Sequence, residues 1–123
     1  MKIVMSIKPG FAELIFDGKK NFEFRRVLFK NPDVKTIIVY ASSPIQKVIG
    51  EFEVESILSM KIDALWDQTR QNAGISKKYF MAYFQHKEIG YAIKVGKVKR
   101  YKQPKCLQKD FGIKPPQSFA YIK

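Results

Sequence analysis

Polar and apolar residues alternate along several parts of the chain with a two-residue period, which is typical of a β-strand that buries one face. This alternation covers residues 2–7, 21–25, 48–57 and 88–98, and more weakly 118–122. Residues 35–41 are instead β-branched and almost continuously apolar, so we expect a strand buried on both faces. The apolar phase slips around Gly96, which predicts a β-bulge there. The chain should therefore contain about six strands.

Helical spacing of apolar residues occupies the intervals between these strands. Residues 9–17 are apolar around most of the helix, with proline at the first position and Gly18 where a left-handed residue would end it. Residues 62–69 form a second helix, and Ser76 is a suitable N-cap for a third. Most successive strands lack a helical crossover, so pairing should be mainly antiparallel. The pattern suits a small α+β barrel with three or four short helices.

The third helix carries a continuous aromatic stripe at positions 79, 80, 83 and 84. A stripe with this spacing usually packs into the core, and this is the expectation for Tyr79, Phe80, Tyr83 and Phe84. The alternative is a surface on which nucleic-acid bases stack.

Composition favours an anionic partner. The 123 residues, taken as a single domain 1–123, have a formal net charge of +12 and a pI near 9.8, which indicates nucleic acid or another polyanion unless the basic surface has no role. Basic residues are densest over 97–105, where Tyr101 lies among Lys97, Lys99, Arg100, Lys102 and Lys105. This run could follow a single-stranded backbone or be a solvated face. The carboxylates Glu51, Glu53 and Glu55 share one strand face, which should point away from bound nucleic acid.

Several classes of chemistry lack the residues they need. His86 and Cys106 are the only histidine and cysteine, so no disulfide and no zinc site of ordinary ligand number is expected. The sequence has no dinucleotide or Walker glycine pattern, and we expect no cofactor. No stretch approaches the roughly 20 apolar residues of a membrane span, and residues 1–5 are too short an apolar run for a signal peptide. These features predict a cytoplasmic protein.

The remaining constellation is Gly18-x-Lys20-x-x-Glu23-x-Arg25. Glu23 and Arg25 share one strand face, and Lys20 lies in the turn before them, so the three can meet at one ligand. In one interpretation Arg25 and Lys20 bind phosphate while Glu23 accepts from a base amino group. In a second, Lys20 is a general base or nucleophile, which requires a lowered pKa. In a third, Glu23 and Arg25 form only a structural ion pair.

This motif resembles the signature of the ASCH family of small, PUA-like β-barrel domains. Its flanks are similar too, from the opening Ser6–Pro9 through Tyr40–Ser42 and 48–52 to the closing 115–119. The resemblance implies that the motif lines a ligand cleft, with Ser6, Lys8, Arg26 and Ser42 nearby.

The resemblance also implies two activities found among ASCH proteins, which are RNA cleavage and removal of an acetyl group from acetylcytidine. In the amidohydrolases a threonine nucleophile stands at the position of Glu23, and a glutamate falls near 70–74, where this chain has no carboxylate. Only Lys20 carries over, so the deacetylase pattern is incomplete.

The sequence therefore predicts a module that binds RNA or a nucleotide-like ligand and has a regulatory role. The alternative is a metal-independent hydrolase of RNA or a modified nucleoside, with Lys20 and Glu23 as its candidate catalytic residues. A third possibility is a module that binds an acidic protein partner. The predicted ligand contacts are Ser6, Lys8, Lys20, Glu23, Arg25, Arg26, Ser42, Lys97, Lys99 and Arg100.

Overall fold

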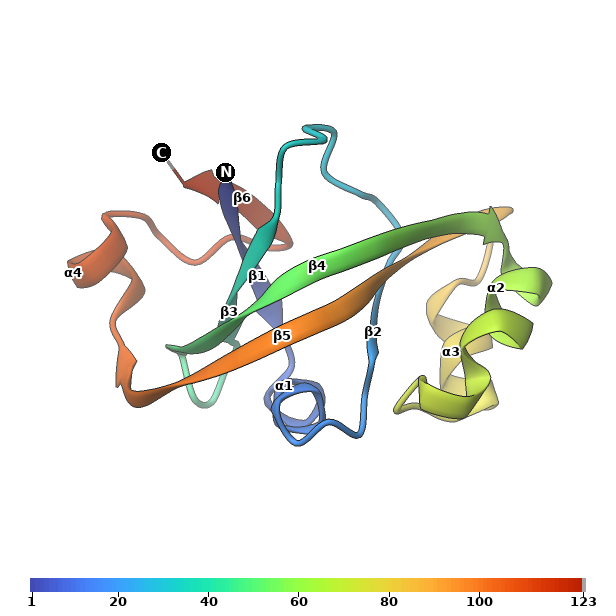
Figure 1. The fold of residues 1–123 in the computed structure, drawn as a ribbon, viewed down its shortest axis with the longest axis horizontal. Helices are drawn as coiled ribbons and strands as arrows, with labels where there is room; N and C mark the ends of the chain where they lie inside the picture. The colour runs from blue at the N-terminus through green and yellow to red at the C-terminus, as the bar shows by residue number, and fades with distance from the viewer. Residues whose placement is uncertain (123) are drawn as a thin grey trace.

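The computed structural model describes residues 1–122, and a six-stranded sheet forms its frame (Figure 1). In sequence order, the elements are β1 (Lys2–Ile7), α1 (Pro9–Phe16), β2 (Phe22–Arg25), β3 (Thr36–Ala41), β4 (Lys47–Lys61), α2 (Ile62–Thr69), a 3₁₀ turn (Arg70–Asn72), α3 (Lys77–Tyr83), β5 (Ile89–Lys105), α4 (Leu107–Phe111) and β6 (Phe119–Ile122). The strand order is β2-β5-β4-β3-β1-β6. Only β1 and β3 pair in parallel, so the expectation of a mixed, mainly antiparallel α+β fold is confirmed.

The two longest strands, β4 and β5, run side by side across the whole molecule, with α2 and α3 at one end and α4 at the other (Figure 1). Phe52 lies opposite Val98, whereas Val54 lies opposite Val95, so β5 has one extra residue in this interval. The β-bulge predicted around Gly96 is therefore confirmed. β5 continues to Lys105, beyond the predicted end of the strand, and the basic run of residues 97–105 is thus part of the sheet.

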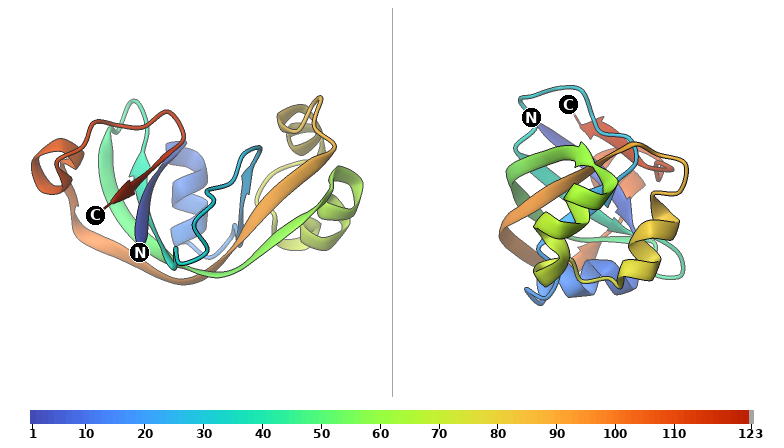
Figure 2. Two further views of the ribbon diagram at one scale, coloured as in Figure 1. Left: turned by 90° about the horizontal axis from the view of Figure 1, so that it is seen from above. Right: turned by 90° about the vertical axis from the view of Figure 1, so that its right-hand side faces the viewer.

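The sheet curls strongly, as the end-on view shows (Figure 2), but its edge strands β2 and β6 do not pair, so the predicted barrel is not closed by hydrogen bonds. Each edge strand is only four residues long. The connection between β2 and β3 contacts β6 through side chains: Phe29 packs edge-on against Phe119. The Tyr121 hydroxyl accepts from the backbone N–H groups of Lys30 and Asn31 at 3.1 and 3.2 Å. These contacts replace the missing strand pairing.

Three groups of buried side chains hold the elements on the sheet. The first fills the inside of the curl and includes Ala12 and Ile15, the two buried residues of α1. Gly50 permits this packing, because a Cβ there would lie 2.6 Å from the Phe16 ring and 2.5 Å from the Lys99 carbonyl oxygen. The second group packs α2 and α3 against β2, and the third places α4 on the opposite face of the sheet.

Candidate functional site

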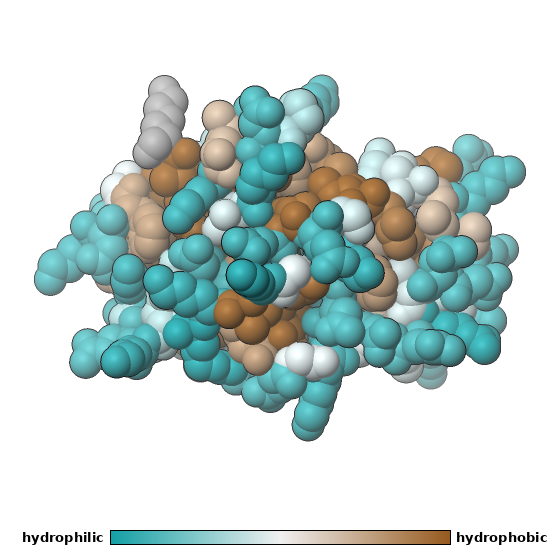
Figure 3. Space-filling view, viewed as in Figure 1, coloured by the Kyte–Doolittle hydropathy of each residue, from teal (hydrophilic) through white to brown (hydrophobic). Residues whose placement is uncertain are grey.

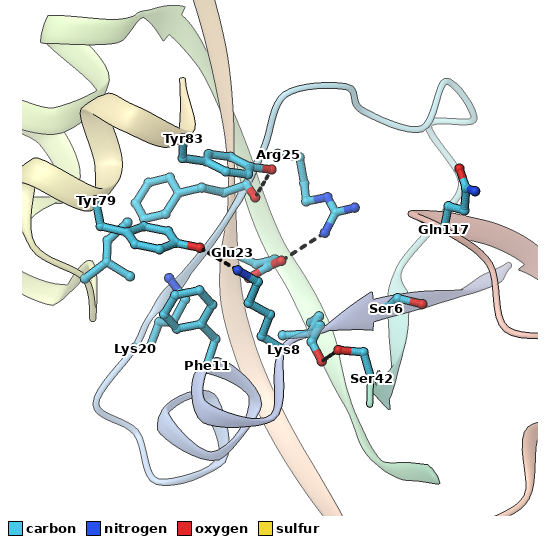
Figure 4. A pocket seen from close by; sticks show the side chains of 13 residues that line it. Ser6, Lys8, Phe11, Lys20, Glu23, Arg25, Ser42, Tyr79, Tyr83 and Gln117 are labelled. Atoms are coloured by element: carbon cyan, nitrogen blue, oxygen red, sulfur yellow. Dashed lines mark hydrogen bonds and ion pairs between the residues drawn. The ribbon is translucent and has the colours of Figure 1, made fainter. Parts of the chain in front are cut away.

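A cleft of about 310 Å³ opens where the end of β1, the start of α1, β2 and α3 meet (Figure 4). It lies on the side of β2 that does not pair with another strand. Its walls combine aromatic rings with charged and hydroxyl groups. The lining residues are Ser6, Ile7, Lys8, Phe11, Lys20, Glu23, Phe24, Arg25, Ser42, Ile75, Tyr79, Tyr83 and Gln117.

Lys20 is a buried cation at one end of this cleft. Gly18, with φ +76°, ends α1 in the left-handed conformation, as predicted, and the backbone N–H of Lys20 donates to Leu14. The residue is only 2% exposed. Its Nζ donates to the Ala73 carbonyl oxygen at 2.9 Å and lies 4.7 Å from the centre of the Phe24 ring. The turn after α1 thus delivers an ammonium group into an aromatic environment.

Burial changes how readily Lys20 holds its proton. Removal from water lowers the pKa of Lys20 to about 8, against an opposing influence from the Glu23 carboxylate. The absence of a side chain at Gly74 leaves room for the lysine stem, because a Cβ there would lie 2.5 Å from the Lys20 Cβ. The segment 70–74 therefore does reach the motif lysine, although it contributes a backbone carbonyl group and no carboxylate.

Glu23 and Arg25 form an ion pair in the floor of the cleft. Arg25 Nη1 lies 3.2 Å from Glu23 Oε2, and the Arg25 side chain is 12% exposed. Burial raises the pKa of Glu23, while Arg25 and then Lys20 act to lower it. The second Nη of Arg25 donates to the Ser118 hydroxyl, which bridges the gap between the edge strands. The pair is anchored on both sides, yet both side chains still face the cleft.

Two tyrosines of α3 form the opposite wall (Figure 4). The Tyr79 hydroxyl accepts from Lys8 Nζ at 3.2 Å, and its ring meets Phe11 edge-on at 5.3 Å. The Tyr83 hydroxyl donates to the Phe24 carbonyl oxygen at 3.1 Å, and burial is the largest influence that raises the pKa of Tyr83. Half of the aromatic stripe is therefore cleft surface.

The other half of the stripe is core, as expected. Phe80 and Phe84 are buried, and their rings contact each other with centres 4.8 Å apart. Sequence reasoning missed the division of the stripe. The available signal was the hydroxyl group on Tyr79 and Tyr83, which are four residues apart and thus lie on one row of the helix.

Comparison with known proteins identifies the fold. The family model of the ASCH domain matches residues 5–100. The chain belongs to the ASCH domain family. It is 30% identical, over 98% of its length and 83% of the relative's, to a protein of Zymomonas mobilis named "ASCH domain-containing ribonuclease". A crystal structure of ASCH from Z. mobilis superposes with a TM-score of 0.90 at 29% identity, covering 99% of this chain and 87% of the other.

A further relative of this ASCH domain is part of a much longer protein. The chain is 35% identical over 98% of its length to the ATP synthase subunit alpha of Ureaplasma parvum, but spans only 15% of that protein. The likeness therefore concerns one segment of the longer chain.

The structure of this ASCH domain brings six of the ten predicted contact residues together: Ser6, Lys8, Lys20, Glu23, Arg25 and Ser42. The Ser6 hydroxyl donates to the Pro116 carbonyl oxygen at 2.6 Å, and its remaining lone pairs are available as acceptors in the cleft. Gln117, in the segment before β6, adds an amide that sequence reasoning missed.

The four other predicted residues do not line the cleft. Arg26 Nη1 donates to the carbonyl oxygens of Tyr83 and Gln85 at 2.7 and 2.9 Å, so it ties the end of β2 to the end of α3. Arg100 pairs with Glu13 at 2.8 Å on the side of the sheet that carries α1. Lys97 and Lys99 are exposed farther along β5.

Strand pairing also corrects the expected segregation of charge. Lys99 lies directly opposite Glu51, and Lys94 pairs with Glu55 at 2.8 Å, so acidic residues of β4 stand beside basic residues of β5. The carboxylate row therefore partly neutralises the basic run. Hydrophilic side chains predominate on the face presented by these strands, with hydrophobic ones exposed between them (Figure 3).

Residues 1–122 lack two further features. No group of three or more His, Cys, Asp and Glu side chains in this range is arranged to hold a metal ion. No helix in the same range is long and apolar enough to cross a membrane.

Proposed function

We propose that this ASCH protein binds RNA, or a nucleotide-like ligand, by enclosing one nucleotide in the cleft. The observation that carries the proposal is the buried Lys20–Glu23–Arg25 cluster beneath an aromatic wall, in a chain with a net charge of +12. We further propose that the chain acts as a single domain in the cytoplasm.

The groups around the cleft match the parts of a nucleotide. A base can stack on the ring of Tyr79, and its polar edge can meet the Glu23 acceptor and the Arg25 donor. Lys8 is exposed beside Tyr79 at the mouth, which suits a phosphate group. The hydroxyl oxygens of Ser6 and Ser42 supply acceptors for the sugar hydroxyls.

The size of the cleft limits how much of a strand it can hold. A volume of about 310 Å³ is at the lower end of the range for small-molecule pockets. This volume favours one nucleotide in the cleft, with the rest of the strand outside it.

A specific observation favours a second candidate, metal-independent cleavage of RNA. The Z. mobilis relative is named a ribonuclease, and the lowered pKa of Lys20 places it near the range suited to a general base. In this alternative, neutral Lys20 accepts the proton of the attacking hydroxyl as its oxygen bonds to phosphorus. Protonated Glu23, whose pKa is raised, donates its proton to the leaving oxygen as the P–O bond breaks. The amidohydrolase version has less support, because segment 70–74 offers only the Ala73 carbonyl beside Lys20.

The test is a gel of end-labelled single-stranded RNA incubated with protein in the presence of a chelator. Lys20→Met keeps the length and burial of the side chain but removes its charge, and Lys97→Ala is the control on a cation outside the cleft. The binding module is supported if the wild type retards the RNA without cutting it, if Lys20→Met weakens this retardation, and if Lys97→Ala does not change it. Shortened RNA whose appearance requires Lys20 supports the nuclease. RNA that is neither retarded nor cut at low salt contradicts both.

A further inference from the structure

A second hollow of about 490 Å³ lies beside the cleft, between the start of α1, the turn after β3 and the far part of β5. Its walls include Pro9, Ile45, Ile49 and Pro104, and two cations, Arg100 and Lys102, face it. Ile45 is 47% exposed, although it is a large apolar side chain. The hollow therefore combines an apolar surface with positive charge.

The cleft and the hollow share a boundary one residue wide. Lys8 lines the cleft and Pro9 lines the hollow, while Ser42 lines the cleft and Ala41 lines the hollow. Consecutive Cα atoms are about 3.8 Å apart, so only the backbone at the ends of β1 and β3 separates the cleft from the hollow. The Ser42 N–H donates to the Ile7 carbonyl oxygen at 3.0 Å, which holds these two strand ends together.

Alternation along β5 sorts its cations between two sides. Arg100, Lys102 and Pro104 line the hollow together with Tyr101, whereas Lys99 lies opposite Glu51 on the other side of the strand. The Arg100 guanidinium lies over the Phe16 ring at 5.1 Å and is held by both carboxylate oxygens of Glu13. Arg100 therefore offsets the charge of Glu13, and it also lies 3.8 Å from Asp17, so Lys102 is the cation of this hollow without a carboxylate partner among the described residues. Lys102 is exposed and has no ion pair within residues 1–122.

We infer that the hollow is a second nucleotide subsite, which receives the neighbouring nucleotide of a single strand held in the cleft. The base packs on Ile45 and Pro104, and Lys102 contacts the backbone phosphate. The strand follows the side of β5 that carries Lys102, because this cation has no ion pair within residues 1–122, whereas Lys99 on the other side lies opposite Glu51. This inference rests on the proposed function, since it needs a nucleotide in the cleft.

The test measures affinity as a function of ligand length. Fluorescein-labelled oligouridylates, from the mononucleotide to the tetranucleotide, are titrated with the wild type, Lys102→Ala and Lys99→Ala at several salt concentrations. We expect tighter binding of longer ligands to the wild type. Lys102→Ala should lower the salt slope for the tetranucleotide by about 0.7, the contribution of one phosphate contact on a single strand. Lys102→Ala should not change the affinity for the mononucleotide, and Lys99→Ala should not change the affinity for either ligand.

Ile45→Asp gives a second, independent readout, since it places a negative charge in the wall of the hollow at an exposed turn. This substitution should weaken binding of the tetranucleotide and leave binding of the mononucleotide unchanged. Equal affinity for all lengths, or equal losses in Lys102→Ala and Lys99→Ala, would overturn the second subsite while leaving the proposed function standing. Absence of binding by every probe would overturn both.

Discussion

Two clusters in this protein are built from the same parts, a cation, a carboxylate and a phenylalanine ring, yet they differ in character. In the cleft, Lys20 lies beside Phe24 and is coupled to Glu23. On the outer side of α1, Arg100 lies over Phe16 and pairs with Glu13. Lys20 as a whole residue is 2% exposed, whereas the side chain of Arg100 is 44% exposed.

The two clusters differ in what sets the pKa values of their groups: the neighbouring charge at the surface, and burial in the cleft. The Arg100 hydrogen bond lowers the pKa of Glu13, and that of Arg100 is raised, so each partner favours the charged form of the other. In the cleft, burial raises the pKa of Glu23 and lowers that of Lys20 despite their attraction. The side chains of the surface pair are open to solvent, whereas the buried groups of the cleft cluster would gain more from a ligand that provides additional hydrogen bonds.

The largest predicted effect comes from removing the partner of the buried carboxylate. Arg25→Met should lower the free energy of unfolding at neutral pH by about 3–5 kcal/mol, because Glu23 keeps its burial and loses its ion pair. Urea denaturation measures this loss. Adding Glu23→Gln to the same protein should restore much of the stability. A loss of less than about 1 kcal/mol is the value expected for a surface ion pair, and it would contradict a larger energetic role for the buried pair.

The next prediction concerns pH. The folded pKa of Lys20 is about 8 and its ordinary value is 10.5, so the unfolded chain binds this proton more tightly. Stability should therefore rise between these pH values, by roughly 2–3 kcal/mol from pH 7 to pH 10 for this group alone. Urea denaturation of wild type and Lys20→Met at both pH values isolates the contribution, since other groups titrate in both proteins. If the free energies of unfolding of the two proteins changed equally with pH, the lowered pKa of buried Lys20 would be contradicted.

A smaller effect should follow from filling the space beside Lys20. Gly74 and Gly112 have nearly the same φ, +70° and +72°, but only at Gly74 would a Cβ collide with another residue, the Lys20 stem. Gly112→Ala should cost about 1–2 kcal/mol for the left-handed backbone alone. Gly74→Ala should cost about 1 kcal/mol more and weaken ligand binding, because Lys20 must shift. Thermal unfolding of both variants, with an RNA-binding assay, compares the two sites directly.

The smallest effect is expected at the exposed cluster. Glu13→Gln should change the free energy of unfolding by less than about 1 kcal/mol, and the difference from wild type should shrink in high salt. Urea denaturation at two salt concentrations is sufficient. A loss comparable to that of Arg25→Met would show that exposure does not separate the clusters.

The sequence predicted those features that depend on local patterns. Strand alternation, the Gly18 cap and the bulge near Gly96 are each set by a few consecutive residues, and all were found as expected. The motif spacing likewise brought Lys20, Glu23 and Arg25 to one cleft, because a turn followed by a strand fixes their relative directions.

The features that were missed depend on pairing between distant segments. The carboxylates of β4 and the cations of β5 formed two separate patterns in the sequence, and only the strand register placed Glu51 opposite Lys99. Closure of the barrel depended on whether two short edge strands would meet. The division of the aromatic stripe depended on which row of α3 faces the core, which neighbouring elements decide.

The single tryptophan gives this molecule a convenient optical property. Trp66 is 9% exposed, packs on Phe80 with ring centres 5.0 Å apart, and is not among the residues that line the cleft. Its emission therefore reports the packing of the helical end of the protein, whereas the proposed ligand would contact Tyr79 in the wall of the cleft. In a ligand titration of each variant, unchanged tryptophan emission would show that the variant stays folded while its affinity is measured.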